Sequence, residues 1–154
     1  MHFFQGVLLK AQSQKSDASE EFRKELLISP KHTAAMLELA KLDLDRKNAA
    51  GAAVLAKRAV EIEPQNPEAH RVCGEALLAG GQVKESIAEL EMAKRLAPDN
   101  ADTHLRLAFA YRKMGRSQDA GLEESAYASI KKREQSNAQS IAERSAQSTA
   151  RGSK

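Results

Sequence analysis

Apolar residues recur along most of the chain at the spacing of one helical face, in runs separated by short polar turns. The run around Met36, Leu39 and Leu42 is typical, and similar runs occupy residues 1–12 and every later segment up to about residue 130. The pattern predicts a chain of about eight helices and an all-α fold.

Start and stop signals bound several of these helices. Asn48 and Asn66 stand where a side chain can accept from the first helical N–H groups, and Pro67 suits the first turn that follows Asn66. Ser16 or Asp17 is expected to cap the second helix in the same way. Gly80-Gly81 predicts a left-handed helix end.

The strongest regularity is a period of 34 residues, the length of a helix-turn-helix repeat. Three kinds of residue recur with this period: prolines, small residues at two positions of each unit, and aliphatic residues. Their members are Pro30, Pro64, Pro98; Gly6, Ala40, Gly74, Ala108; Ala18, Ala52, Ser86, Ala120; and Ile28, Ile62, Leu96, Ile130. Small residues at fixed positions predict close helix contacts inside each unit.

With these columns the chain resembles the tetratricopeptide repeat family. The best-matching unit has Cys73-Gly74, Leu77, Gly81, Ser86, Leu90, Ala93 and Pro98 at the family's pattern positions. The resemblance implies a right-handed α-solenoid of about four antiparallel helix-turn-helix units with a C-terminal capping helix. The domain would span residues 1–135, with units at about 1–30, 31–64, 65–98 and 99–132. The polar stretch 136–154 has little to bury and is expected to be a disordered tail.

The family's first helices line a concave groove that receives a peptide or helix of a partner, and the resemblance carries this role to matching positions. The predicted groove residues are Leu37, Lys41, Leu44, Arg71, Glu75, Leu78, Leu105, Phe109 and Arg112, extended by Phe3, Val7, Lys10 and Lys113. One sub-class clamps the carboxylate of chaperones with a Lys and an Asn in its first repeat. Phe3 and Val7 stand at those two places, which argues against a clamp of this kind.

Composition narrows the partners and the compartment. A net charge of +3 is weak, and aromatic residues are not interleaved with basic ones, so no nucleic-acid partner is expected. No run is long and apolar enough for membrane insertion, and Met1–Lys10 lacks the features of a signal peptide. A cytoplasmic location is the expectation. Because the chain starts almost inside a repeat, a longer chain with a leader sequence remains an alternative.

No constellation for catalysis, metals or cofactors emerges. His2, His70 and His104 recur at one repeat position, but equivalent positions in stacked helices lie about 8–10 Å apart, too far to share one ion. Packing or interhelical hydrogen bonding is the better interpretation. Cys73 is expected to be a small core residue. We expect no catalytic residue, no cofactor and no metal, and therefore no enzyme.

Three functional interpretations follow. The first is a protein–protein interaction module, or scaffold, that binds a peptide or helix in the concave groove. The second is a regulatory or docking segment of a larger enzyme or of a secretion or assembly machine. The third is end-to-end self-association through Phe3, Phe4 and Leu8, which lie in the incomplete first unit.

Overall fold

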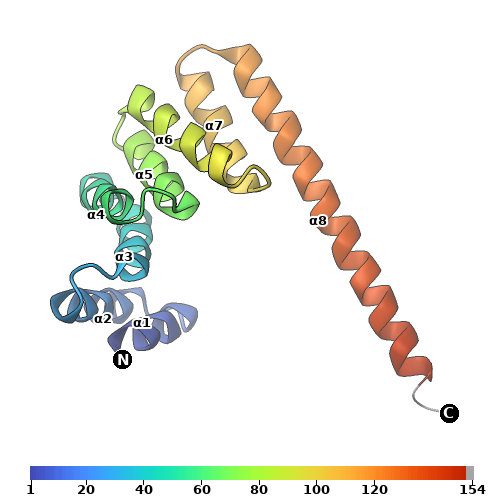
Figure 1. Ribbon diagram of the computed structural model, residues 1–154, viewed down its shortest axis with the longest axis horizontal. Helices are drawn as coiled ribbons and strands as arrows, with labels where there is room; N and C mark the ends of the chain where they lie inside the picture. Colours follow the sequence, from blue (N-terminus) through green and yellow to red (C-terminus); the bar gives the residue numbers. More distant parts are fainter. Residues whose placement is uncertain (152–154) are drawn as a thin grey trace.

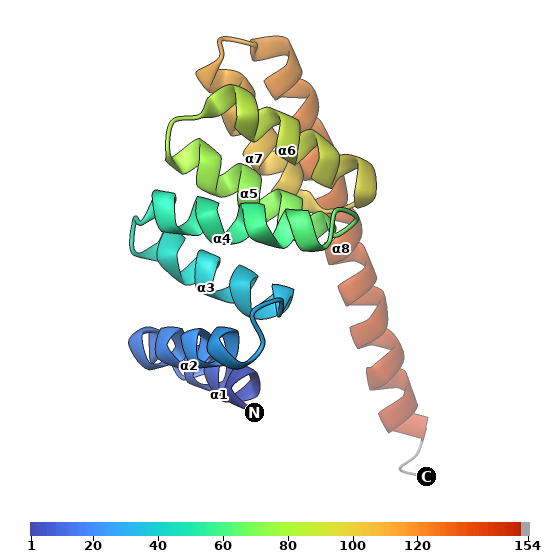
Figure 2. The same cartoon turned by 60° about the vertical axis from the view of Figure 1, so that its left-hand side comes forward.

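The computed structural model describes the backbone of residues 1–151 and the side chains through residue 148, and in that range it consists of eight α-helices and no strand. Consecutive helices form four antiparallel pairs, which stack into the predicted α-solenoid (Figures 1 and 2). The helices are α1 (His2–Ala11), α2 (Lys15–Ile28), α3 (Thr33–Asp45), α4 (Ala49–Ile62), α5 (Pro67–Ala79), α6 (Val83–Leu96), α7 (Ala101–Lys113) and α8 (Ser117–Arg151).

Asparagine side chains cap three of the helices, because an Asn oxygen can accept from the free N–H groups of the first turn. Asn48 accepts from the N–H of Gly51, and Asn66 accepts from Glu68 and Ala69. Both caps were predicted. The predicted cap of α2 is wrong, since that helix begins at Lys15, two residues before Asp17, and has no side-chain cap.

Each unit packs on its neighbour through the face between a second helix and the next first helix. Phe22 and Leu39 belong to the core between the first two units, Cys73 to the core around the second and third, and Leu90 and Leu107 to the last. All five are almost fully buried. No unit has a closed core of its own, so the stack is the stable object.

The small positions inside the units permit the close helix contacts that the sequence predicts. A Cβ on Gly6 would lie 2.7 Å from the Phe22 ring, and one on Gly74 would lie 2.5 Å from Cγ of Leu90. At this second crossing, the Ser86 hydroxyl also donates a 2.7 Å hydrogen bond to the Gly74 carbonyl. The absence of a side chain on α5 is therefore what lets α6 approach it.

The histidine column joins the two helices of a unit by side-chain hydrogen bonds, as predicted. Nδ1 of His70 lies 2.7 Å from a Glu89 oxygen, and Nδ1 of His104 lies 2.6 Å from a Glu123 oxygen. In the first unit, His2 lies 2.6 Å from Glu21. The partner is always the residue 19 positions later, on the facing helix, so each histidine connects helices within its own unit.

The C-terminal helix differs from the expectation of a disordered tail after residue 135. Its first part packs on α7 and buries Ala120 and Ile130, and the helix then continues to Arg151 with every described side chain after Ile130 exposed. Both views show this distal part projecting away from the body (Figures 1 and 2). Extending a nucleated helix is cheap for Ala, Gln, Glu and Arg, so the segment needs no core to be helical. Residues 152–154 of the predicted tail lie outside the described range, and the domain boundary at 135 stays a prediction.

Within the described residues, no helix is both long and apolar enough to cross a bilayer. Helix α8 has sufficient length, but polar and charged side chains surround it.

Candidate functional site: the surface of the first helices

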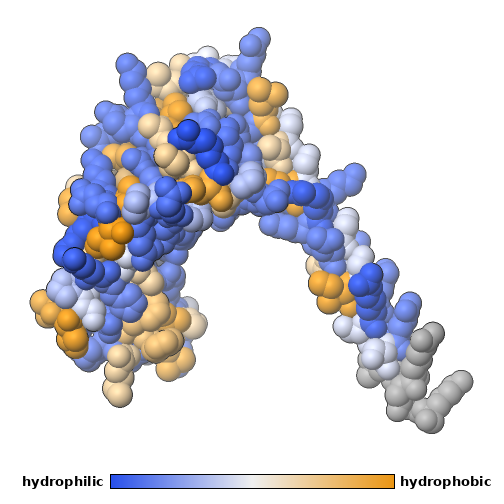
Figure 3. All heavy atoms as spheres, in the orientation of Figure 1, coloured by the Kyte–Doolittle hydropathy of each residue, from blue (hydrophilic) through white to orange (hydrophobic). Residues whose placement is uncertain are grey.

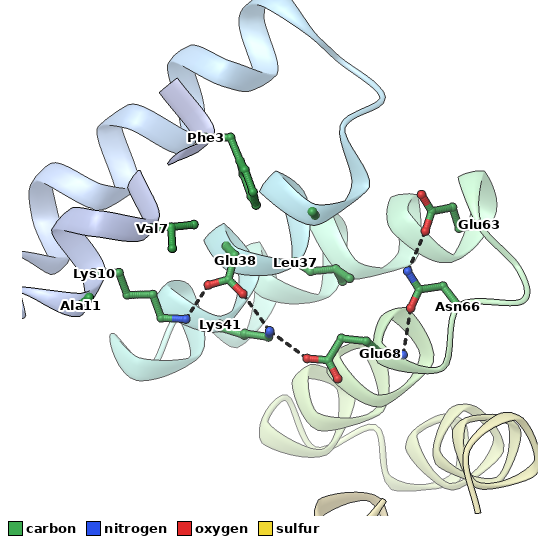
Figure 4. A pocket seen from close by; sticks show the side chains of 11 residues that line it. Phe3, Val7, Lys10, Ala11, Leu37, Glu38, Lys41, Glu63, Asn66 and Glu68 are labelled. Carbon is green, nitrogen blue, oxygen red and sulfur yellow. Dashed lines mark hydrogen bonds and ion pairs between the residues drawn. The ribbon is translucent and has the colours of Figure 1, made fainter. Parts of the chain in front are cut away.

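The first helices of the four units, α1, α3, α5 and α7, share one surface of the stack and form two hollows there. The N-terminal hollow has a volume of about 650 Å³ and lies between α1 and α3, reaching the start of α5 (Figure 4). Its apolar side chains come from Phe3, Val7, Ala11, Ala34 and Leu37. Its polar side chains come from Lys10, Glu38, Lys41, Glu63, Asn66 and Glu68.

Aromatic packing sets one wall of the N-terminal hollow. The Phe3 ring contacts Phe22 at 5.9 Å and the His32 ring at 4.7 Å between centroids, which holds it against the body of the stack. The His32 ring in turn lies 2.9 Å from a Glu25 carboxylate oxygen. The sequence assigned Phe3 to a groove and also to a self-association face, and its contacts favour the groove.

The C-terminal hollow has a volume of about 620 Å³ and lies along α3, α5 and α7. Leu44, Leu78 and Phe109 provide its main apolar surface, and Phe109 is 56% exposed. Four basic residues and two acidic ones also line it, namely Lys15, Lys47, Arg106, Lys113, Asp45 and Glu75.

The rim of the C-terminal hollow is positively charged. Lys15 pairs with Asp45 at 2.6 Å and Arg106 pairs with Glu75 at 2.7 Å, which leaves Lys47 and Lys113 without an ion pair among the described residues. The Nε of Arg106 is buried and has no hydrogen-bond partner within the described part of the chain. This hollow therefore combines apolar surface with uncompensated donors.

An ion-pair ladder crosses the surface between the two hollows and connects all four first helices. It alternates in sign through Lys10, Glu38, Lys41, Glu68, Arg71, Glu75 and Arg106. Figure 4 shows its first part, in which Glu38 bridges Lys10 and Lys41. The link from α3 to α5 is the 2.8 Å pair between Lys41 and Glu68.

The middle of the ladder is held firmly in its charged state. Burial alone would raise the pKa of Glu68, but hydrogen bonds from Arg71 and Lys41 outweigh it and lower that pKa to about 2. Burial likewise opposes the charge of Lys41, and its bonds to Glu68 and Glu38 still raise its pKa. A ligand that took over one of these charges would have to replace its present partner.

The predicted groove residues divide into three groups in the structure. Leu37 and Lys41 lie in the N-terminal hollow, whereas Leu44, Glu75, Leu78 and Phe109 lie in the C-terminal one. Arg71 is only 12% exposed and is occupied by Glu68 and Glu75. Arg112 pairs with Glu124 of α8 at 2.5 Å, and neither Arg112 nor Leu105 lines a hollow.

Sequence reasoning included Glu75 but missed the other acidic members of the ladder, and it missed three cations of the C-terminal hollow, namely Lys15, Lys47 and Arg106. Glu38 and Glu68 precede Lys41 and Arg71 by three residues, a spacing that predicts pairs on one helix and could have identified them. No local signal identifies Arg106, because its partner Glu75 lies on another helix. Lys47 was not predicted as a site residue because it lies in the turn between α3 and α4, where its backbone has a φ of 64°.

Comparison with known proteins supports the repeat assignment. Residues 43–100 match a family model described as tetratricopeptide repeat. The TPR repeat-containing thioredoxin TTL4 of Arabidopsis thaliana is 36% identical over 73 residues, which cover 47% of this chain and 11% of that protein. The chain thus matches only a small part of that relative.

Solved structures show the same fold at low sequence identity. MamA from Desulfovibrio magneticus RS-1 superposes with a TM-score of 0.77 at 20% identity, covering 85% of this chain and 74% of MamA. The first TPR of Spaghetti (RPAP3), solved with an HSP90 peptide, gives 0.71 at 18% identity, covering 74% of this chain and 90% of its own. Residues 43–100 thus match the tetratricopeptide repeat model, and the stack of four helix pairs shares the fold of these solved structures.

Proposed function

We propose that the surface of the first helices binds a partner polypeptide and that the chain acts as a protein–protein interaction module. The observation that carries this proposal is the pair of hollows, each with apolar side chains that no other part of the described chain covers. Apolar residues gathered in a concave, partly polar surface are typical of binding sites. The related fold of the RPAP3 repeat, solved with a peptide, supports this use of the architecture.

Apolar side chains of the partner would enter the hollows, and its acidic groups would meet the free cations. Lys47 and Lys113 are better placed for this than Arg71 and Arg112, which the sequence had suggested, because both arginines already have carboxylate partners. A carbonyl or carboxylate of the partner would also satisfy Nε of Arg106. The proposed apolar contacts are therefore Leu37, Leu44, Leu78 and Phe109. The proposed polar contacts are Lys47, Lys113 and Arg106, with Lys41 and Glu75 as members of the ladder.

The test is affinity capture from a lysate of the source cells with matched variants. Val7→Asp places a charge in the N-terminal hollow and Phe109→Asp places one in the C-terminal hollow. The control Val54→Asp changes an apolar residue of α4 that is 69% exposed and lies outside both hollows. Because all three sites are at least 41% exposed, each variant should keep the helical circular dichroism of the wild type.

The expected result is a set of proteins that the wild type and the control retain and that at least one hollow variant loses. Loss with Phe109→Asp alone would place the contact at the C-terminal hollow. Retention of the same set by all four proteins would contradict the proposal.

The second candidate function is a docking or regulatory segment of a larger protein. The observation that favours it is the relative TTL4, whose name joins such repeats to a thioredoxin and of which this chain matches 11%. Here the occupant of the hollows would be another domain of the same protein. Proteolysis of the native protein would then release this repeat region together with a second, bound fragment.

A further inference from the structure

The ring of His70 has a hydrogen-bond acceptor at each of its two nitrogens. Nδ1 lies 2.7 Å from a carboxylate oxygen of Glu89 on α6, and Nε2 lies 2.9 Å from the carbonyl oxygen of Pro64, in the turn before α5. Neither an ionised carboxylate nor a backbone carbonyl can donate. A neutral imidazole has one N–H group and can satisfy only one of the two contacts, whereas an imidazolium satisfies both.

The next unit repeats this arrangement 34 residues later. Nδ1 of His104 lies 2.6 Å from an oxygen of Glu123 on α8, and Nε2 lies 2.8 Å from the carbonyl oxygen of Pro98. Here a third group favours the ionised carboxylate, because Nζ of Lys94 donates to the other Glu123 oxygen at 2.8 Å. An ammonium group cannot accept a hydrogen bond, so the second proton belongs to the ring.

Both rings lie inside the stack, where water cannot easily replace a missing partner. His70 is 6% exposed and His104 is 7% exposed. On the face that Figure 3 shows, by contrast, hydrophilic residues cover most of the body of the stack. A buried acceptor that loses its donor destabilises the fold, so the protonation of these rings affects stability.

In the third unit, the charges around His70 come from the helices on both sides of α5. Glu89 on α6 contacts the ring directly. Lys57 on α4 and Glu89 both act on Cys73, one turn after His70, where burial and Glu89 raise the pKa of the thiol to about 12 and Lys57 lowers it. Helix α5 reaches α3 and α7 through the ion-pair ladder, on the surface of the first helices. The carboxylate that contacts the ring favours its positive charge.

In the fourth unit, Lys94 on α6 lies between two carboxylates. Its Nζ is 3.0 Å from an oxygen of Glu91 and 2.8 Å from one of Glu123. One cation thus faces two anions, and a protonated His104 balances them.

The second unit carries an apolar version of the same contact. Met36 and Leu55 stand 34 residues before His70 and Glu89. Met36 is completely buried, and Leu55 packs against the same apolar cluster. An apolar pair can therefore join the two helices of a unit, and the histidine motif adds a dependence on one proton.

We propose that His70 and His104 carry two ring protons in the folded chain at neutral pH and act as pH-sensitive locks, each of which ties the two helices of its unit to the turn before them. Loss of one proton leaves either the carboxylate or the carbonyl without its donor, so each lock keeps one of its two hydrogen bonds. The third and fourth units therefore loosen as the pH rises, whereas the contact of Met36 with Leu55 does not respond.

Proton linkage fixes the direction of the effect on stability. Imidazole in an unfolded chain has a pKa of about 6.5, so above this pH the folded chain holds protons that the unfolded chain has released. Stability falls with rising pH wherever the folded state binds more protons. The contribution of the locks is complete below about pH 6.5 and is lost as the folded rings release their protons at higher pH.

Long-range proton–nitrogen correlation spectra of the full chain at pH 7 test the protonation directly. The signals of His70 and His104 are assigned by their loss in His70→Met and His104→Met. Each ring should show two protonated nitrogens. One protonated and one unprotonated nitrogen in either ring would overturn the proposal.

Urea unfolding at pH 6 and pH 9 tests the effect on stability. The variants His70→Met/Glu89→Leu and His104→Met/Glu123→Leu copy the apolar pair of the second unit, and each should remove about half of the fall in the wild-type midpoint that depends on the locks. The control Glu134→Gln changes an exposed carboxylate and should keep the wild-type dependence on pH.

The same fall in midpoint in the wild type and in both double variants would contradict the proposal. Should a double variant not fold, the spectra of the wild type still decide between one and two ring protons. Neither measurement depends on a partner at the hollows.

Discussion

Replacing Gly74 with Ala has two opposite effects on stability: Ala favours the helix, but its Cβ collides with Leu90. The structure predicts that the collision prevails. In an exposed helix the substitution stabilises by about 1 kcal/mol, because Ala has the higher helix propensity. At Gly74, however, the new Cβ would lie 2.5 Å from Cγ and 2.9 Å from Cδ2 of Leu90. Carbon atoms in contact prefer about 3.5–4.0 Å, so Leu90 or the whole of α6 would have to move by about 1 Å.

Neither movement is easy. Leu90 is fully buried in the core of the last two units, and the Ser86 hydroxyl ties α6 to the Gly74 carbonyl at 2.7 Å. Overpacking of a filled core costs about 1–3 kcal/mol, and loss of the hydrogen bond would add about 1 kcal/mol. After subtracting the gain in propensity, we expect Gly74→Ala to lower the free energy of unfolding by about 1–3 kcal/mol.

Gly121→Ala is the matched control, since this glycine lies within α8 and a Cβ there would meet nothing within 4 Å. It should stabilise by about 0.5–1 kcal/mol. Thermal and urea unfolding followed by circular dichroism measure both variants, and each kcal/mol should shift the midpoint by about 2–4 °C. A Gly74→Ala protein that melts at or above the wild-type temperature would refute the steric argument, whatever the control does.

Three further predictions use the same unfolding assay or thiol chemistry. Cys73 is buried, and burial raises the pKa of its thiol to about 12. The native protein should therefore resist thiol reagents at pH 8 and react only on unfolding. Rapid labelling of the folded protein would contradict this. Glu123→Ala removes the partner of both His104 and Lys94 and should destabilise by about 1–3 kcal/mol, whereas the exposed Glu134→Ala should change little. The pKa of Glu68 is lowered from 4.5 to about 2, so its contribution to folding stability is complete above pH 4.5 and is lost as the pH falls towards 2. In Glu68→Gln, stability should therefore depend less on pH in this range. An acid unfolding profile identical to that of the wild type would show that the ladder is not formed in solution.

Much of the fold was predictable because its determinants are local or periodic. The bounds of α4 and α6 follow from the patterns around Asn48 and Val83, where turn signals and helical spacing agree. The cap of α2 was predicted wrongly, because Ser16 and Asp17 are residue types that favour an N-cap, whereas the helix begins at Lys15 with Gln14 at the N-cap and no side-chain cap. The full length of α8 was not predicted, because a helix that is exposed on all sides has no apolar pattern in its sequence.

The candidate site was less predictable than the fold. Side chains such as Leu37 and Phe109 could be assigned to the surface of the first helices by their repeat positions. Charge pairing between helices could not be assigned in this way. Arg71 and Arg112 looked available for a partner, and the structure shows both occupied by carboxylates, one within its own helix and one on α8.

The sequence by itself determined that the chain is a stack of helix pairs, because the 34-residue period places small, aliphatic and turn residues at equivalent points of every unit. Only the tertiary structure decided how those points are filled. Gly6 faces Phe22 and Gly74 faces Leu90, so each missing side chain is matched by a large one on the facing helix. Such packing, like the ladder of ion pairs, depends on distances between residues that are remote in the chain, and periodicity alone does not specify those distances.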